Sequence, residues 1–317
     1  MSQQATIGLD VGGTKLAGVR LEGMHVTARA SQPTEKRSGE DLLEQMAVIA
    51  EELGCDTAQG VGAGVPSAVE WETGHVLASV NVPFQDFAVR DQLSDRLGVP
   101  VAIDNDANVA ALAEAHADDG TVARHLVMFT LGTGVGGGIV INGSVYRGAT
   151  GGAGHLGHEI VAAAADGQRV NEGFPRPDSL EALAAGPSLD ALAHEAAQAG
   201  EGALAKVLEA GREPSGRDIV EAAAGGDAAA LALIERYASR LALGVSNMIH
   251  TFDPDEIVIG GGVSAAGEML LEPLKRAVAP LILPGIGTRT QIRLARHGSD
   301  AGAIGAALLA REAHRNG

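Results

Sequence analysis

The chain has 317 residues, 45% of them hydrophobic, and its formal net charge is −17. This length favours two domains that each bury a core of their own, and the acidic balance argues against a nucleic-acid partner, which would need clustered Lys and Arg. Cys55 is the single cysteine of the sequence, which excludes an internal disulfide and a cysteine-rich metal site.

The start of the sequence lacks the pattern of a secreted protein. Residues 1–6 have neither the basic region nor the apolar region of a signal peptide. Glycine or a charged residue interrupts every long apolar stretch, so we expect no membrane span and no membrane partner. Together with the lone cysteine, these features predict a cytoplasmic location.

The first 115 residues alternate between strand and helix patterns. A hairpin comes first, followed by an amphipathic helix, a strand that stops at Pro66, and a strand that leads into a second helix. The expected strands are residues 7–11, 16–21, 60–65 and 101–103, and the expected helices are residues 39–53 and a helix that begins at 104–106.

The second half begins with an expected strand, 126–130, and Asn142-Gly143 is a strong signal for a hairpin turn. The sequence then becomes rich in alanine, which predicts helices up to about residue 249. The expected helix caps are Asp178, Ser188 and Ser215. The last expected elements are strands 256–259 and 291–295 and a helix 300–313. Alternating strands and helices predict α/β domains.

Two glycine turns repeat each other 120 positions apart. The first is residues 10–15, Asp-Val-Gly-Gly-Thr-Lys, and the second is residues 131–136, Leu-Gly-Thr-Gly-Val-Gly. Without a gap, Gly12 aligns with Gly132, and the next glycines and the flanking apolar residues also agree. In such turns, backbone N–H groups crowd onto an anion, and threonine adds a hydroxyl donor. Two facing loops of this kind predict a polyphosphate site, and hence an ATP-dependent phosphotransferase with a duplicated fold.

Other nucleotide-binding patterns fit less well. Gly132-x-Gly134-x-x-Gly137 matches the dinucleotide fingerprint, but the sequence after it predicts a strand and a hairpin instead of the required helix. Gly260-x-Gly262-x-x-Ala265 does lie between a strand and a helix, so a redox enzyme stays open as an alternative. A Walker A sequence is absent.

The glycine turns resemble the phosphate-binding elements of the superfamily of sugar kinases, heat-shock ATPases and actin. In detail, the chain resembles the ROK family of sugar kinases and repressors, and its glucokinase-like branch. Seven motifs carry the resemblance, which runs over nearly the whole chain. They are residues 10–15 and 131–138 (phosphate elements), 62–66 (a strand that ends at the sugar), 103–108 (Ile-Asp-Asn-Asp-Ala-Asn, catalytic), 154–158 (Gly-His-Leu-Gly-His, sugar), 180–186 (the end of the zinc loop) and 260–262 (adenosine).

The resemblance implies an α/β fold of two similar actin-like ATPase (ribonuclease H-like) domains around a central cleft. Residues 1–115, completed by the C-terminal helix 300–317, would form the N-terminal domain for sugar and phosphate. Residues 116–299 would form the C-terminal domain, which binds the nucleotide. The implied cofactors are ATP and Mg²⁺, and the implied assembly is a homo-oligomer, a dimer or a tetramer.

The implied activity is ATP-dependent phosphorylation of a hexose at its primary hydroxyl, with glucose as the first candidate. N-acetylmannosamine, N-acetylglucosamine, amino sugars and cyclitols remain alternative substrates. A non-catalytic sugar sensor is a further alternative. Repressors of the family carry an added N-terminal helix-turn-helix region, and the first expected strand begins too early for one here.

Site residues follow from the matched motifs. Asp106 is the expected general base, since phosphoryl transfer needs a carboxylate that takes the acceptor's hydroxyl proton, and we expect the helix N-terminus to keep it ionised. Asp10 is expected to hold Mg²⁺ through water. The expected sugar-binding residues are Gly64, Pro66, Asn81, Asn105, Asp106, His155, His158 and Glu181. The expected ATP-binding residues are Asp10, Gly12, Gly13, Thr14, Lys15, Gly132, Thr133, Gly134, Gly261 and Gly262.

Six of these residues also have a simpler local explanation. Asp106 also fits an ordinary acid at a helix N-terminus, Asp10 an acid that caps a turn at a strand end, and His158 an ordinary loop histidine. Asn105 or Asp104 is in position to cap the following helix. Glu181 with Asp178 has the spacing of a capping box. Lys15 either adds charge near the phosphates or points to solvent.

The sequence departs from the family pattern at His155, where the family usually has glutamate. A carboxylate only accepts hydrogen bonds from sugar hydroxyls, whereas a neutral imidazole has one donor and one acceptor. Some members that resemble N-acetylmannosamine kinases also carry histidine there. His155 therefore weakens a strict glucose assignment.

The zinc loop of the family, Cys-x-Cys-Gly-x-x-Gly-Cys-Leu-Glu after a ligand histidine, is also altered. The matching residues 165–179 contain no cysteine, and Ser179 stands at the last cysteine position. Without thiolates a tetrahedral zinc site cannot be assembled from this loop, so no structural zinc is expected. We expect other packing, involving Phe174 and the prolines, to order the loop and hold His158 toward the sugar.

Overall fold

The computed structural model describes residues 5–79, 81–162, 175–200 and 202–316. The chain divides into two compact units. Unit 1 comprises Met1–Met128, Gly138–Gly154 and Arg296–Gly317, and unit 2 comprises Phe129–Gly137 and His155–Ala295. The domains expected from the sequence, 1–115 with 300–317 and 116–299, stay a prediction.

Unit 1 is built on a five-stranded sheet of order β3-β2-β1-β4-β8. The strands are β1 (Thr6–Val11), β2 (Lys15–Glu22), β3 (His25–Pro33), β4 (Val61–Val65) and β8 (Val101–Asn105). The first three strands pair antiparallel, while β1, β4 and β8 run parallel. The carboxyl ends of these three strands therefore lie at the same edge, which is where ligands bind in open α/β sheets.

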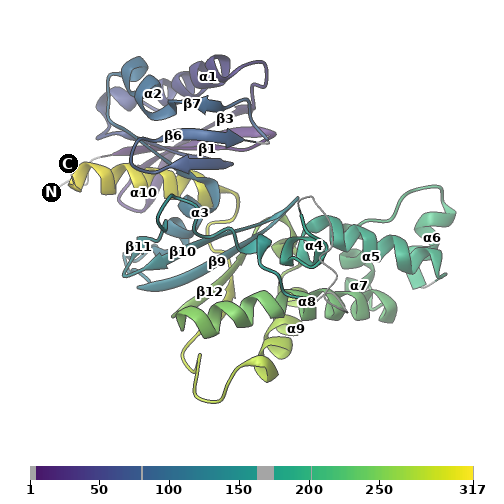
Figure 1. Ribbon diagram of the computed structural model, residues 1–317. Helices are drawn as coiled ribbons and strands as arrows, with labels where there is room; N and C mark the ends of the chain where they lie inside the picture. The colour runs from purple at the N-terminus through teal and green to yellow at the C-terminus, as the bar shows by residue number, and fades with distance from the viewer. Residues whose placement is uncertain (1–4, 80, 163–174, 201, 317) are drawn as a thin grey trace. The chain divides into compact units, whose positions relative to one another are not determined.

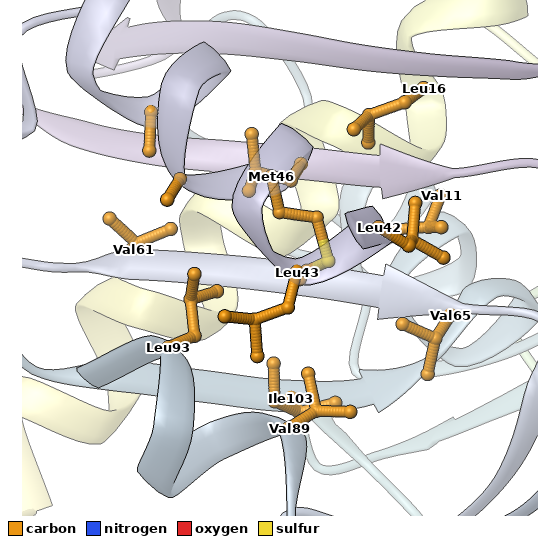
Figure 2. Packing of buried hydrophobic residues seen from close by; sticks show 14 of the residues in the cluster. Val11, Leu16, Leu42, Leu43, Met46, Val61, Val65, Val89, Leu93 and Ile103 are labelled. Atoms are coloured by element: carbon orange, nitrogen blue, oxygen red, sulfur yellow. The ribbon is translucent and has the colours of Figure 1, made fainter. Parts of the chain in front are cut away.

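One face of this sheet packs against two helices, α1 (Gly39–Glu52) and α2 (Val89–Leu97). Side chains alternate along a strand, so Ile7, Leu9 and Val11 point to this face while the residues between them point away. Figure 2 shows Leu42, Leu43 and Met46 of α1 meeting side chains from β1, β4 and β8. Ser38 begins α1 by accepting a hydrogen bond from Asp41 N–H at 3.1 Å.

The other face of the sheet carries α10 (Ala301–Asn316), with α3 (Asp106–Ala115) beside it (Figure 1). The backbone of α10 lies close to β1 and β4 because both strands have glycine on this face. A Cβ atom on Gly8 or Gly62 would overlap backbone atoms of α10. Where the two helices cross, a Cβ atom on Gly305 would overlap the carbonyl oxygen of Val109. Unit 1 is completed by a smaller sheet of β5 (Ser67–Glu70), β6 (His75–Ser79) and β7 (Gln85–Phe87).

The second five-stranded sheet has the order β11-β10-β9-β12-β13. Its strands are β9 (His125–Leu131), β10 (Val135–Ile141), β11 (Ser144–Val145), β12 (Glu256–Gly260) and β13 (Gln291–Leu294). This order repeats that of the first sheet strand for strand, which confirms the duplication expected from the glycine turns. Asn142 and Gly143 form the expected hairpin turn, with positive φ angles of 55° and 81°.

Six helices lie in unit 2 among the described residues. They are α4 (Leu180–Ala184), α5 (Gly186–Gln198), α6 (Gly202–Glu209), α7 (Gly216–Ala224), α8 (Ala228–Phe252) and α9 (Glu268–Val278). Short 3₁₀ helices are η1 (Cys55–Thr57) and η6 (Gly298–Asp300) in unit 1, and η2 (Leu156–His158), η4 (Gly262–Ala266) and η5 (Ala279–Leu281) in unit 2. Among the described helices, none combines the length and apolar character that crossing a membrane requires.

The expected caps were right at one position and wrong at two. Ser215 caps α7 in a capping box with Asp218. Asp178 does not cap α4, because Ser179 takes this place and accepts from Ala182 N–H at 3.3 Å. Ser188 lies inside α5, since the helix already begins at Gly186, and its hydroxyl donates to backbone carbonyls instead.

Candidate active site

Three residues of unit 1 lie side by side at the carboxyl ends of its parallel strands. Asp10 of β1 is in register with Gly64 of β4, and Gly64 is in register with Asp104 of β8. Asn105 ends β8, and Asp106 begins α3. Gly64 leaves room for this junction, because a Cβ atom on it would lie only 3.4 Å from Asp106 Cα. Sheet topology thus brings the two expected acids, Asp10 and Asp106, to one edge.

Asn105 is the residue that caps α3. Its Oδ1 atom accepts hydrogen bonds from Ala107 N–H at 2.9 Å and from Asn108 N–H at 3.4 Å. Its Nδ2 atom donates to the Ser67 carbonyl at 3.3 Å. Of the two capping candidates, the structure selects Asn105, and Asp104 Oδ1 instead accepts from the Asn105 N–H group at 2.7 Å. The Asn105 amide is therefore held firmly in one orientation.

Both acids at this edge bind protons more readily than ordinary aspartates. Burial raises the pKa of Asp106 to about 6, although hydrogen bonds from Ala107 and Asn105 lower it. Burial, and then the charge of Asp106, raise the pKa of Asp10 to about 6, against a smaller lowering effect of Lys15. Asp106 is therefore still ionised at neutral pH, as expected, but the loss of hydration raises its pKa more than the hydrogen bonds at the start of α3 lower it. A carboxylate with this pKa is well matched to general base catalysis near neutral pH.

Gly302 in the first turn of α10 is a site residue that the sequence did not indicate. A Cβ atom at this position would lie 2.5 Å from Cγ of Asp10. The Asp10 carboxylate therefore rests against the N-terminal turn of α10, where a negative charge is favourable. No local pattern could have revealed this, since Gly302 follows Asp10 by almost the whole length of the chain.

The first glycine turn exposes its central residues. Gly12 N–H donates to the Lys15 carbonyl at 3.0 Å, and Thr34 Oγ1 donates to the Gly12 carbonyl at 2.6 Å. Thr14 and Lys15 are exposed at the tip of the turn. Asn81 lies beside the turn, because a Cβ atom on Gly13 would be 3.3 Å from the Asn81 Cβ atom. The expected sugar residue Asn81 and the first phosphate turn are thus neighbours.

The second glycine turn borders a cavity of about 580 Å³ within unit 2. Gly132 N–H donates to the Gly134 carbonyl at 2.9 Å, and the Gly132 carbonyl accepts from Gly186 N–H at 2.7 Å. Gly261 has a φ of 82°, and a Cβ atom on it would overlap the Leu131 backbone. The cavity is lined by Gly132, Thr133, Gly186, Pro187, Leu189, Asp190, Gly216, Arg217, Val220, Gly262, Val263, Ala265 and Ala266. Of the expected ATP residues, Gly132, Thr133 and Gly262 line this cavity.

Glu181 and the segment between His155 and His158 both contact Val135, the first residue of β10. Glu181 Oε2 accepts a hydrogen bond from Val135 N–H at 2.9 Å. Gly157 packs on the Val135 carbonyl oxygen, which a Cβ atom on Gly157 would overlap. The capping-box alternative for Glu181 was therefore wrong: its side chain bonds to the end of the second glycine turn, not to its own helix.

His155 directly precedes η2 and His158 is its last residue; both are exposed, with ring centres 6.2 Å apart. Partial burial, and then the charge of His158, lower the pKa of His155 below its ordinary value. His155 is therefore neutral at neutral pH and has one donor and one acceptor.

The altered zinc loop lies largely outside the described residues, including residues 165–169 and Phe174. In the part of the chain that the structure describes, no group of three or more His, Cys, Asp or Glu side chains is placed to hold a metal ion. Mg²⁺ does not require such a group, since it usually takes one or two carboxylates, substrate phosphates and water. Asp10, with a second carboxylate nearby and the first glycine turn following it, fits that donor set.

Comparisons with known proteins identify the family of the chain. A sequence profile described as "ROK family" matches residues 6–313. A glucokinase of Halalkalibacterium halodurans is 35% identical over 324 residues, covering 98% of this chain and 96% of that protein. An N-acetyl-D-glucosamine kinase of Aliivibrio fischeri is 31% identical over 306 residues, covering 95% of this chain and 98% of that protein. A ROK family glucokinase from Streptomyces griseus, crystallised with glucose and AMPPNP, has a TM-score of 0.79 at 28% identity and covers 97% and 99% of the two chains.

Proposed function

The chain belongs to the ROK family, and we propose that it is an ATP-dependent hexose kinase that phosphorylates the primary hydroxyl of its sugar, with glucose as the first candidate. The observation that carries this proposal is the register of the parallel strand ends, which brings Asp10 and Asp106, two carboxylates of raised pKa, to one edge of the sheet. Full-length relatives named glucokinase support the same activity.

In unit 1, Asp106 acts as the general base. It takes the proton of the sugar's primary hydroxyl while the oxygen attacks the γ-phosphorus of ATP. Positioning and charge stabilisation provide most of the acceleration in phosphoryl transfer. Asn105 binds a neighbouring hydroxyl and is held in place by its cap bonds, and Gly64, Pro66 and Asn81 border the sugar. The leaving group is ADP.

The glycine turns bind the phosphates of ATP through backbone N–H groups and the hydroxyls of Thr14 and Thr133. Lys15 adds a positive charge to the first turn, and Gly261 and Gly262 approach the adenosine. Asp10 would hold Mg²⁺ through water, and the ion would neutralise charge on the phosphates. His155, His158 and Glu181 of unit 2 bind further sugar hydroxyls, with Glu181 keeping Oε1 for this contact while Oε2 bonds to Val135.

His155 makes the choice between glucose and an N-acetylated sugar testable. A neutral imidazole can donate to the carbonyl of an acetamido group, which a glutamate cannot do. We therefore expect His155→Glu to raise the ratio of kcat/KM for glucose to that for N-acetylglucosamine by about tenfold, the upper end of what one hydrogen bond between neutral groups contributes. Coupled measurement of ADP release over glucose, mannose, N-acetylglucosamine, N-acetylmannosamine, glucosamine and a cyclitol reads this ratio directly.

The same panel tests the proposed function as a whole. Turnover that depends on one sugar supports the kinase and identifies its substrate. If a sugar binds but no ADP is released, the protein is a non-catalytic sugar sensor and the kinase proposal is wrong. A ratio that does not move in His155→Glu would remove His155 from the residues that decide specificity. Asp95→Asn, on the exposed surface of α2, serves as the control variant.

The pH profile of kcat/KM gives a second test. A general base works in its ionised form, so activity should be constant above neutral pH and fall as the pH drops through about 6, the raised pKa of Asp106. Asp10 titrates in the same range. The acid limb of the profile should therefore be steeper than the titration of a single proton would make it. A profile that stays flat down to about 4, where an ordinary aspartate titrates, would show that the catalytic base does not have the raised pKa of Asp106.

We also propose a cytoplasmic location, where ATP is available and a reduced Cys55 is stable, and a homo-oligomeric assembly. Light scattering coupled to size-exclusion chromatography measures the molar mass and therefore the number of subunits.

A further inference from the structure

A buried ion pair lies directly beside the end of β8, outside the roles proposed so far. Arg147 Nε donates to Asp104 Oδ2 at 2.7 Å, and the two side chains are 14% and 5% exposed. The other oxygen of Asp104 accepts from Asn105 N–H at 2.7 Å and from Asn108 Nδ2 at 2.9 Å. A single carboxylate therefore binds the strand end, the first turn of α3 and Arg147 at the same time.

Arg147 also stacks on Trp71. Its guanidinium carbon lies 3.4 Å from the centre of the Trp71 ring. Trp71 directly follows β5, and β5 carries Ser67, whose carbonyl accepts Asn105 Nδ2 at 3.3 Å. The contacts thus form a closed ring from Trp71 through β5 to Asn105 and Asp104, and back through Arg147. This ring includes the end of β8, where α3 begins.

A contribution to folding stability does not by itself explain this arrangement. Arg147 Nη2 and Ser67 Oγ are buried, and neither has a hydrogen-bond partner among the residues that the structure describes. Buried polar groups without partners destabilise a fold, and apolar replacements of a buried ion pair are often neutral or stabilising. A planar guanidinium does offer fixed geometry, since it can direct a carboxylate while its face lies on an aromatic ring.

We infer that Arg147 is a positioning residue for phosphoryl transfer, which fixes the junction of β8 and α3 through Asp104 and so sets the direction of Asp106. This inference rests on the proposed function. Asp106 follows Asp104 by two residues, and its backbone leaves the same strand end that Asp104 binds. A reacting group that is misplaced by 1 Å can lose on the order of 10² in rate.

The test uses Arg147→Met, which keeps the volume and removes the charge, and Arg124→Met as a matched control. Arg124 is an exposed residue, and its guanidinium donates a hydrogen bond to Asn142 Oδ1 at 3.0 Å. In Arg147→Met we expect kcat to fall by about 10²-fold, while the KM values for sugar and ATP change little. The control should keep both parameters. In Arg147→Ala, millimolar guanidinium should restore part of kcat, and it should not restore Asp106→Asn.

Two readouts do not depend on activity. Trp71 is the only tryptophan of the sequence, so its emission should change in Arg147→Met and not in the control. Amide hydrogen exchange should rise in the peptide 101–112, which contains the junction, and stay unchanged elsewhere. These readouts test the ring of contacts even if the wild type proves inactive on every sugar, which would overturn the proposed function first.

Three results would overturn the inference. The first is an Arg147→Met variant that keeps the kcat of the wild type. The second is a loss of kcat that follows only a loss of folded protein, without rescue by guanidinium. The third is exchange in the peptide 101–112 that equals that of the wild type.

Discussion

Asp106→Asn should lower kcat by about 10²–10⁴-fold, the usual contribution of a general base, with little change in the KM values for sugar and ATP. An asparagine keeps the shape and the Oδ1 acceptor for Ala107 N–H, which Asp106 now bonds at 2.8 Å. What it loses is the ability to take a proton. Steady-state kinetics of ADP release, with the sugar that the panel identifies, measures this effect.

Stability separates this loss of chemistry from a loss of fold. The folded pKa of Asp106 is raised to about 6, above the ordinary value of about 4. The group therefore favours the folded state most when it is protonated, and this contribution is lost as the pH rises through about 6. A neutral asparagine avoids the burial of charge, so the variant should melt no lower than the wild type at neutral pH. A variant that keeps its kcat would remove Asp106 from catalysis.

Among glycine-to-alanine substitutions in unit 1, Gly305→Ala should lower the stability most. The added Cβ would overlap the Val109 carbonyl oxygen where α10 crosses α3, and backbone atoms cannot move aside as a flexible side chain can. We expect the free energy of unfolding to fall by about 3 kcal/mol, the upper end for overpacking. For a domain of this size that corresponds to about 6–12 °C in Tm. Calorimetry or circular dichroism measures the shift.

Gly225→Ala is the matched control for this substitution. Gly225 ends α7, is exposed and has a φ of −79°, which any residue can adopt. The expected change in the free energy of unfolding is within about 0.5 kcal/mol. Alanine is the better helix former by about 1 kcal/mol, so a Gly305→Ala variant that melted above the wild type would show that α10 and α3 can separate without cost.

The sequence predicted most of the secondary structure, because the glycine turns and the apolar periodicity are local signals. The hairpin at Asn142-Gly143 and the helix α1 formed as expected. Errors arose where several residues could each play the same local role. Ser179 displaced Asp178 as a cap, and Glu181 left its own helix for the Val135 N–H group. For Glu181 the deciding partner, Val135, lies 46 residues away in the sequence.

The sequence by itself determined the duplicated α/β fold, the family and the candidate acids, because these depend on short motifs whose order and spacing can be read directly. Only the tertiary structure decided that burial, rather than the helix N-terminus, dominates the pKa of Asp106. It alone placed Gly302 against Asp10 and Arg147 against Asp104. The physical reason is that desolvation and packing depend on every atom that surrounds a group, and most of those atoms come from segments far away along the chain.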